Sequence, residues 1–89
     1  MKGIITVLGK DTKGIIAKIC MYLYEQEINI LDISQTILQD YFNMIMIVDL
    51  SESKIDYEQL EDGLAAVAQG VGVTIKLQRE DIFNSMHRI

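Results

Sequence analysis

Two kinds of hydrophobic pattern alternate along this chain of 89 residues, and their order limits the folds that it can adopt. Residues 4–8 are almost all apolar, which is typical of a strand buried on both faces in the middle of a sheet. After a glycine-bearing bend at residues 9–14, apolar side chains recur at helical spacing at Ile16, Ile19, Cys20 and Leu23. The pattern predicts a strand, a bend and an amphipathic helix, with Asp11 or Thr12 as the helix cap.

Residues 29–38 and 41–50 are two strand-like runs on either side of Gln39 and Asp40, which predicts a hairpin. In the expected register, a core face is formed by Leu31, Ile33, Gln35 and Ile37 opposite Val48, Met46, Met44 and Phe42. The reverse face carries Asp32, Ser34, Thr36 and Asn43 together with Tyr41, Ile45 and Ile47. This mixture is more apolar than a solvated face needs, so we expect something to cover part of it.

The second half of the chain again contains a helix-like pattern followed by a strand-like pattern. Asp56 and Gln59 have the spacing of a capping box, and a second helix is predicted to run to Gly70 through Tyr57, Leu60, Leu64 and Val67. Gly63 within it is expected to mark a close approach to the sheet. Residues 73–79 alternate as a strand does, with Val73, Ile75 and Leu77 pointing inward. The tail from 81 to 89 predicts a short helix that must pack on this subunit or another.

The predicted order is therefore βαββαβ within a single domain, residues 1–89. Two right-handed crossovers around a hairpin give a four-stranded antiparallel sheet with both helices on one face. We therefore expect an α+β fold, the ferredoxin-like sandwich, with a short C-terminal helix added. This fold by itself assigns no function.

Charge and composition exclude several classes of partner. A formal net charge of −5 and a pI of about 4.6 oppose binding to nucleic acid or to an anionic membrane surface. No apolar run approaches the roughly 20 residues of a membrane span. Cys20 is the single cysteine, so no intrachain disulfide can form, which fits a reducing compartment. We expect a cytoplasmic protein. Because a domain of this size has a modest hydrophobic core, we expect self-association to contribute to its stability.

The bend is the first candidate site. Gly9 and Gly14 have the spacing of a phosphate-binding loop, but Ile15 and Ile16 stand where that motif requires lysine and a hydroxyl residue. A nucleoside-triphosphate site is therefore excluded. What remains is a turn into a helix whose unpaired backbone N–H groups suit a carboxylate, with a simple tight turn as the alternative.

The chain offers no constellation for catalysis or metal binding. His87 is the only histidine and Cys20 the only cysteine, so neither a metal cluster nor a nucleophile with its base can be assembled. We expect no enzyme activity and no cofactor, and interpret Cys20, Met44 and Met46 as packing residues. The charge run Glu58, Glu61 and Asp62 is predicted to face solvent. RNA-binding sheets of this topology carry aromatic rings on the outer face, and residues 4–8 have none.

The residues that most narrow the choice are the bend Gly9-Lys10-Asp11-Thr12-Lys13-Gly14-Ile15-Ile16 and the segment Glu27-Ile28-Asn29-Ile30. They resemble the corresponding segments of ACT domains in glycine-cleavage repressors and formyltetrahydrofolate deformylases. Residues 32–36, 41–44 and 82–89 are similar to a family of stand-alone single ACT domains of unassigned function. The resemblance covers essentially the whole chain.

The resemblance implies a homodimer, paired side by side or face to face, that holds an amino acid at the interface. The implied ligand-binding residues are Gly9, Asp11, Thr12, Lys13, Gly14, Ile15 and Asn29. Backbone amides from Asp11 to Ile15 would take the ligand carboxylate, Gly14 would allow close approach, and Asn29 would bind polar groups. Lys13 replaces a common proline, and Asp11 replaces an asparagine of some relatives, so it either attracts an ammonium or repels a carboxylate.

Two functions follow as hypotheses. In the first, the dimer binds an amino acid or similar small metabolite and modulates a partner protein. In the second, it is a ligand-independent assembly module whose sheet and tail bind another protein. The pocket, and the functional assignment that depends on it, require the bend after residue 8 to lie beside Asn29.

Overall fold

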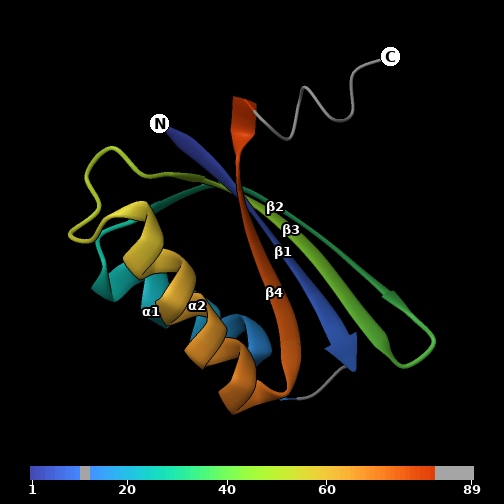
Figure 1. Ribbon diagram of the computed structural model, residues 1–89. Helices are drawn as coiled ribbons and strands as arrows, with labels where there is room; N and C mark the ends of the chain where they lie inside the picture. The colour runs from blue at the N-terminus through green and yellow to red at the C-terminus, as the bar shows by residue number, and fades with distance from the viewer. Residues whose placement is uncertain (11–12, 82–89) are drawn as a thin grey trace.

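The computed structural model describes residues 1–10 and 13–81, and within these ranges the chain forms elements in the order βαββαβ. They are β1 (Lys2–Lys10), α1 (Ile15–Glu25), β2 (Asn29–Leu38), β3 (Tyr41–Asp49), α2 (Tyr57–Val71) and β4 (Val73–Arg79). The strand order is β2-β3-β1-β4, every neighbouring pair is antiparallel, and both helices lie on one face (Figure 1). The predicted ferredoxin-like fold is confirmed, while the predicted C-terminal helix falls on residues 82–89, outside the described part.

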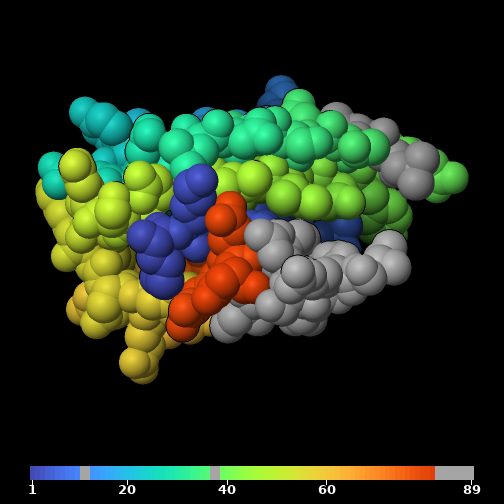
Figure 2. Space-filling model, turned by 90° about the horizontal axis from the view of Figure 1, so that it is seen from above, coloured from blue at the N-terminus to red at the C-terminus, as the bar shows by residue number. Residues whose placement is uncertain are grey.

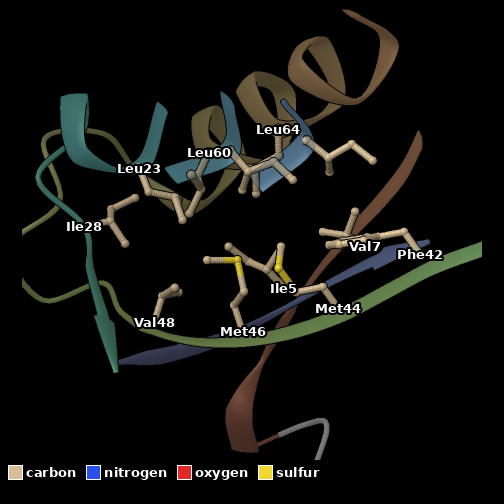
Figure 3. Close-up of a cluster of buried hydrophobic side chains, with 12 residues drawn as sticks. Ile5, Val7, Leu23, Ile28, Phe42, Met44, Met46, Val48, Leu60 and Leu64 are labelled. Carbon is tan, nitrogen blue, oxygen red and sulfur yellow. The ribbon is translucent and has the colours of Figure 1, made fainter. Parts of the chain in front are cut away.

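The hydrophobic core lies between this face of the sheet and the two helices. In Figure 3 the side chains of Ile5 and Met46 point from the sheet toward Leu60 and Leu64 of α2. Met44 and Met46 are fully buried, which confirms their interpretation as packing residues. On α1 the buried positions are Ile15, Ile19 and Leu23. The prediction that Ile16 is buried is wrong, because the helix begins at Ile15 and turns Ile16 toward solvent.

β1 is buried on both faces only near its start. Ile5 and Val7 face the helices with no exposed surface, and Ile4, on the outer face, is 3% exposed. Leu8, on the same face as Ile4, is 51% exposed. The expectation that residues 4–8 are buried on both sides is therefore correct for Ile4 and wrong for Leu8.

The hairpin has the predicted register over most of its length. Backbone pairing joins Ile33 to Met46, Gln35 to Met44 and Ile37 to Phe42. The fourth predicted pair is wrong, because a bulge between Ile30 and Asp32 places Ile30, instead of Leu31, opposite Val48.

β2 is less buried than predicted. Leu31 is 45% and Ile33 is 42% exposed, although the core face was expected to bury both. β2 is the edge strand of the sheet, and its hairpin with β3 extends away from the helix layer (Figure 1). The helices therefore cover β3 and leave this edge open.

The boundaries of α2 follow from its end residues. Asp56 accepts a hydrogen bond from the Gln59 backbone N–H at 2.8 Å, and the Asp56 N–H donates to Gln59 Oε1 at 3.1 Å, which confirms the capping box. The helix runs past its predicted end at Gly70 to Val71, and Gly72 caps it with φ 76°. Gly63 approaches Tyr22 of α1, so the close approach is between helices and the predicted one to the sheet is wrong.

β4 completes the layer. Val73, Ile75 and Leu77 are half-buried and pack against the core, which confirms their predicted direction. The Tyr57 hydroxyl of α2 donates to the Leu77 carbonyl at 3.0 Å and so ties the helix to this strand. Burial raises the pKa of Tyr57, as does the nearby Glu61 carboxylate.

Candidate functional site

The bend after β1 lies where β1, α1 and the start of β4 meet. Gly9 pairs with Val73, and a Cβ added at Gly9 would come within 2.8 Å of the Val73 side chain. A side chain at position 9 would therefore push β4 away from β1. Lys10 ends the strand, and Asp11 and Thr12 lie outside the described residues. Lys13 is exposed beside the bend.

Gly14 is the N-cap of α1 and adopts a left-handed conformation with φ 84°. Among the described residues no side chain makes a capping hydrogen bond at this helix start, and the predicted caps Asp11 and Thr12 lie outside the described residues. A Cβ at Gly14 would meet no atom within 4 Å, which leaves open space beside the first helical turn. Ile15 is 1% exposed, so it anchors the turn in the core and offers only its backbone N–H to a ligand.

The start of α1 has the electrostatics of an anion site. The first N–H groups of a helix lack partners within it, and the helix dipole adds partial positive charge there. The first turn contains no acidic side chain. Lys10 and Lys13 lie on the preceding segment, so the described residues at this end of the subunit favour a negatively charged group. Asp11, between the two lysines in the sequence, lies outside the described residues and adds one negative charge to the bend.

Asn29 lies at the other end of the sheet. It pairs with Asp49, which in turn pairs with Lys2, whereas Gly9 pairs with Phe42 near the hairpin turn. Eight strand residues separate the level of Lys2 from that of Lys10, about 27 Å along the sheet. Figure 1 shows β2 beginning beside the start of β1, far from the bend that follows β1.

The expectation that the bend lies beside Asn29 within the subunit is therefore wrong. The residues expected to bind a ligand divide into Gly9, Lys13, Gly14 and Ile15 at one end and Asn29 at the other. A pocket made of both cannot form inside one subunit. The crossover predicted from the sequence was the signal for this, because β1 and β2 run in the same direction and must begin at the same end.

Asn29 lines a polar hollow of about 240 Å³ that sequence reasoning missed. Its other lining residues are Glu27, Asp49, Ser51 and Glu52. The Ser51 backbone N–H donates to Asp49 Oδ1 at 3.0 Å, and the hydrogen bonds from Ser51 lower the pKa of Asp49. Three carboxylates near one amide give this hollow negative charge, which the N-terminal ammonium and Lys2 offset in part, since both also lower the pKa of Asp49.

Glu27 reaches this hollow through an unusual backbone conformation. Its φ is 60°, in the left-handed region, and it follows the last turn of α1. The N–H of Glu27 donates to the Tyr24 carbonyl and that of Ile28 to the Leu23 carbonyl, at 3.0 and 2.9 Å. This is a Schellman motif, which usually has glycine at the position of Glu27.

The structure also places the other side chains that the sequence analysis considered, which are Cys20 and the acidic residues of α2. Cys20 packs at the margin of the core, and burial raises the pKa of its thiol, which disfavours the reactive thiolate. Glu58, Glu61 and Asp62 are exposed, as predicted. Glu61 and Asp62 also line an open hollow of about 580 Å³ between α2 and β4, and this hollow contains none of the expected ligand-binding residues.

Within the described residues, no group of three or more His, Cys, Asp and Glu side chains has the arrangement of a metal site.

The fold, with its glycine bend before α1 and the exposed edge of β2, is that of a small ferredoxin-like domain, and its family follows from comparison with known proteins. A family model of the ACT domain matches residues 3–78, so the chain belongs to the ACT-domain family. The UPF0237 protein of Clostridium acetobutylicum is 54% identical over 89 residues, which is 100% of both chains. The ACT domain protein from Streptococcus pneumoniae is 43% identical, with a TM-score of 0.82 over 93% of each chain.

More distant structures share the fold. A putative glycine cleavage system transcriptional repressor has a TM-score of 0.76 at 22% identity, covering 86% of this chain and 44% of its own. A formyltetrahydrofolate deformylase from Pseudomonas putida has a TM-score of 0.78 at 18% identity, covering 88% and 28%. The resemblance inferred from the two motifs is therefore confirmed at the level of family and fold. ACT domains are generally regulatory, ligand-binding modules.

In the part of the chain that the structure describes, neither α1 nor α2 combines the length and the apolar character needed to cross a membrane.

Proposed function

We propose that this protein is a cytoplasmic regulatory homodimer that binds an amino acid or a similar small metabolite between its subunits and modulates a partner protein. The observation that carries the proposal is the open edge of β2. Side-by-side pairing of two such edges brings together the two halves of the expected site, which one subunit keeps apart.

The edge of β2 has the features of a pairing strand. It is ten residues long and contains no lysine or proline, and its one charged residue is Asp32, next to the bulge. Natural proteins usually block such an edge with short strands, charges or proline, because its unpaired backbone groups recruit another strand. Leu31 and Ile33 add half-exposed apolar surface to this edge. In Figure 2 the atoms of β2 form a continuous ridge along one side of the molecule.

The symmetry of a dimer supports the cross-subunit site. Two copies of β2 related by a two-fold axis run antiparallel, so the first residue of one strand lies opposite the last residue of the other. Asn29 of the partner subunit then lies level with the end of β2, which is the end of the sheet that carries Gly9 and Gly14. The bend of one subunit and Asn29 of the partner subunit then lie at the same end of the paired sheet.

The chemistry of the two halves suits an amino acid. The free N–H groups and dipole of α1, with Gly14 leaving open space, attract a carboxylate. Asn29 of the partner subunit, in its acidic hollow, offers hydrogen bonds and negative potential to an ammonium group. A zwitterionic ligand that spans the two halves therefore binds only to the dimer. The role that we infer for this site is binding, without a catalytic step.

Isothermal titration calorimetry of the full chain against each amino acid and the common one-carbon metabolites tests the proposal. We expect at least one ligand to bind, and Asn29→Ala to reduce its affinity at least tenfold, because a hydrogen bond to a charged group is worth about 1.5–3 kcal/mol. Asn43→Ala, on the exposed outer face of β3, is the matched control and should bind as the native chain does. Silence for every ligand would reject sensing and favour the ligand-independent assembly module.

A further inference from the structure

β4 forms the second edge of the sheet, because within the described residues β1 is the strand that pairs with it. α2 runs alongside β4 in the opposite direction (Figure 1). The open hollow of about 580 Å³ lies between them and forms the α2–β4 groove, which is lined by Glu61, Asp62, Leu64, Ala65 and residues 75–78. A groove between a helix and an edge strand suits an extended peptide, which can pair with the strand and place alternate side chains against the helix.

The register of the sheet shows which backbone groups of β4 point into open space. The hairpin turn has two residues, so the pair that closes it, Leu38 and Tyr41, is hydrogen-bonded. Hydrogen-bonded residues alternate along each strand, and carried across β3 and β1 this alternation makes residues 74, 76 and 78 those that bond to β1. The N–H and C=O groups of Ile75 and Leu77 therefore point away from β1, toward the edge.

The wall that α2 provides is acidic at one turn and small at the next. The Tyr57 hydroxyl donates to the Leu77 carbonyl at 3.0 Å, which fixes the first turn of α2 beside that residue. Glu61, one turn later, adds to the rise in the Tyr57 pKa that burial causes, so its carboxylate lies nearby. Ala65 follows after another turn, and both Glu61 and Ala65 are exposed. The groove thus offers a carboxylate and then a space as it runs from Leu77 toward Ile75.

The spacing of this wall matches an extended chain. One helical turn from Glu61 to Ala65 advances about 6 Å, and alternate residues of a strand are about 6.6 Å apart. Side chains of an added strand that lie beside Ile75 and Leu77 point to the helix side, as those two residues do. An added strand therefore faces Glu61 with one side chain and Ala65 with the side chain two residues away.

Charge specifies the first of these two side chains. Glu61 and Asp62 carry the charge on the helix side of the groove. Lys76 also lines it, but Lys76 alternates with the inward residues of β4 and projects to the outer face. The Arg79 guanidinium is held by the Asp81 carboxylate at 2.9 Å. In the part of the chain that the structure describes, the helix side of the groove is therefore negative and complements a basic side chain.

A second copy of the chain does not suit this groove. Pairing of two β4 edges by a two-fold axis would place both α2 helices on the same side of the joint sheet. Glu61 and Asp62 of each copy would then face those of the other, and like charges that face one another across an interface oppose binding. An extended segment of a different protein that carries a basic side chain avoids this repulsion.

We propose that the α2–β4 groove docks an extended segment of a partner protein, which adds as a strand beside β4 with lysine or arginine beside Glu61 and an apolar side chain beside Ala65. The inference rests on the proposed function in so far as it gives the modulated partner its chemistry. The β4 edge is the opposite edge from β2, so docking and dimer formation do not compete for a surface.

NMR titration of the full chain with a defined peptide tests the docking. The probe is Thr-Val-Thr-Arg-Thr-Val-Thr with both ends blocked, whose palindromic order fits either strand direction. We expect saturable shifts of the Ile75 and Ala65 amides with a Kd of about 1 mM or below, and binding about tenfold weaker for the peptide with glutamate in place of arginine. Equal binding of the two peptides, shifts confined to β2, or no saturable shift because residues 82–89 fill the groove would each overturn the proposal.

Two matched pairs of variants locate the groove. Glu61→Lys should weaken the arginine peptide about tenfold and favour the glutamate peptide, whereas Glu25→Lys, the same charge change at an exposed position of α1, should do neither. Ala65→Phe should fill the groove and abolish binding, whereas Ala66→Phe, at an exposed position outside its lining, should not. Equal effects within either pair would reject the groove. Because the peptide test contains no amino-acid ligand and reads β4, its failure is distinguishable from failure of the calorimetric test of ligand binding.

Discussion

Gly63 of α2 lies against the ring hydroxyl of Tyr22 of α1, so closely that a Cβ at position 63 would overlap the hydroxyl oxygen and the adjoining ring carbon. Glycine costs about 1 kcal/mol relative to alanine inside a helix. The close contact between the two helices explains why glycine occupies this position, because a larger residue would collide with Tyr22.

Gly63→Ala is therefore expected to destabilise the fold by about 1–2 kcal/mol, although alanine favours a helix, because overpacking a helix contact costs about 1–3 kcal/mol. In a Tyr22→Leu background the same substitution should be neutral or stabilising by up to about 1 kcal/mol, since the phenol is gone. Urea unfolding of the four chains measures the coupling. A Gly63→Ala effect that is the same in both backgrounds would contradict the contact.

Glu27→Gly is expected to stabilise the protein by about 0.5–1 kcal/mol. Glutamate in the left-handed conformation costs about 1–2 kcal/mol, which glycine avoids. Part of this gain is offset because the unfolded chain with glycine has more conformational entropy to lose on folding. The control is Glu25→Gly in the last turn of α1, which should destabilise by about 1 kcal/mol. Thermal unfolding monitored by circular dichroism distinguishes the two. A loss of stability in Glu27→Gly would mean that interactions of the Glu27 side chain stabilise the fold by more than its left-handed backbone conformation destabilises it.

The carboxyl of Asp49 should titrate below its ordinary range in an NMR titration, because the Ser51 backbone N–H donates to it. Its lowered pKa means that the folded state gains from ionised Asp49 above an ordinary pKa of about 3.9 and loses this gain as pH falls through the folded value. Asp49→Asn should therefore lower stability at neutral pH and lose this effect in acid.

Ser51→Ala is the control for that titration, because it removes the hydroxyl and keeps the backbone donor. Most of the pKa lowering should remain in Ser51→Ala, since the backbone hydrogen bond is its largest cause. An ordinary pKa for Asp49 in the native chain would show that the hydrogen bond does not persist in solution.

Local patterns predicted the elements, and non-local geometry limited the rest. The capping box of Asp56 and Gln59 and three pairs of the hairpin follow from spacing within one or two elements. The alternating hydrophobic pattern of β2 does not predict the bulge before Asp32. The exposure of Ile33 could not be predicted either, because it depends on how far the helices extend over the sheet. Tyr22 meets Gly63 only through the packing of two helices.

The two segments of the candidate site stay a prediction, and the structure places them at opposite ends of the sheet. The bend and Asn29 were chosen from sequence motifs, which do not say whether two segments belong to one subunit or to two. Helix α1 carries the chain back along the sheet between these two segments. As a result, the bend and Asn29 lie at opposite ends of the sheet within one subunit. The proposed dimer would bring them to the same end of a paired sheet, so the oligomeric state is the central question.

Sedimentation equilibrium at micromolar concentration tests the account most directly, with the native chain, Ile33→Lys on the β2 edge and Leu8→Lys on the outer face. A charge on the edge blocks strand pairing, whereas the outer face is not part of the proposed interface. We predict a dimer for the native chain and for Leu8→Lys, and a monomer for Ile33→Lys. A native monomer, or a dimer that survives Ile33→Lys and is lost in Leu8→Lys, would contradict the account.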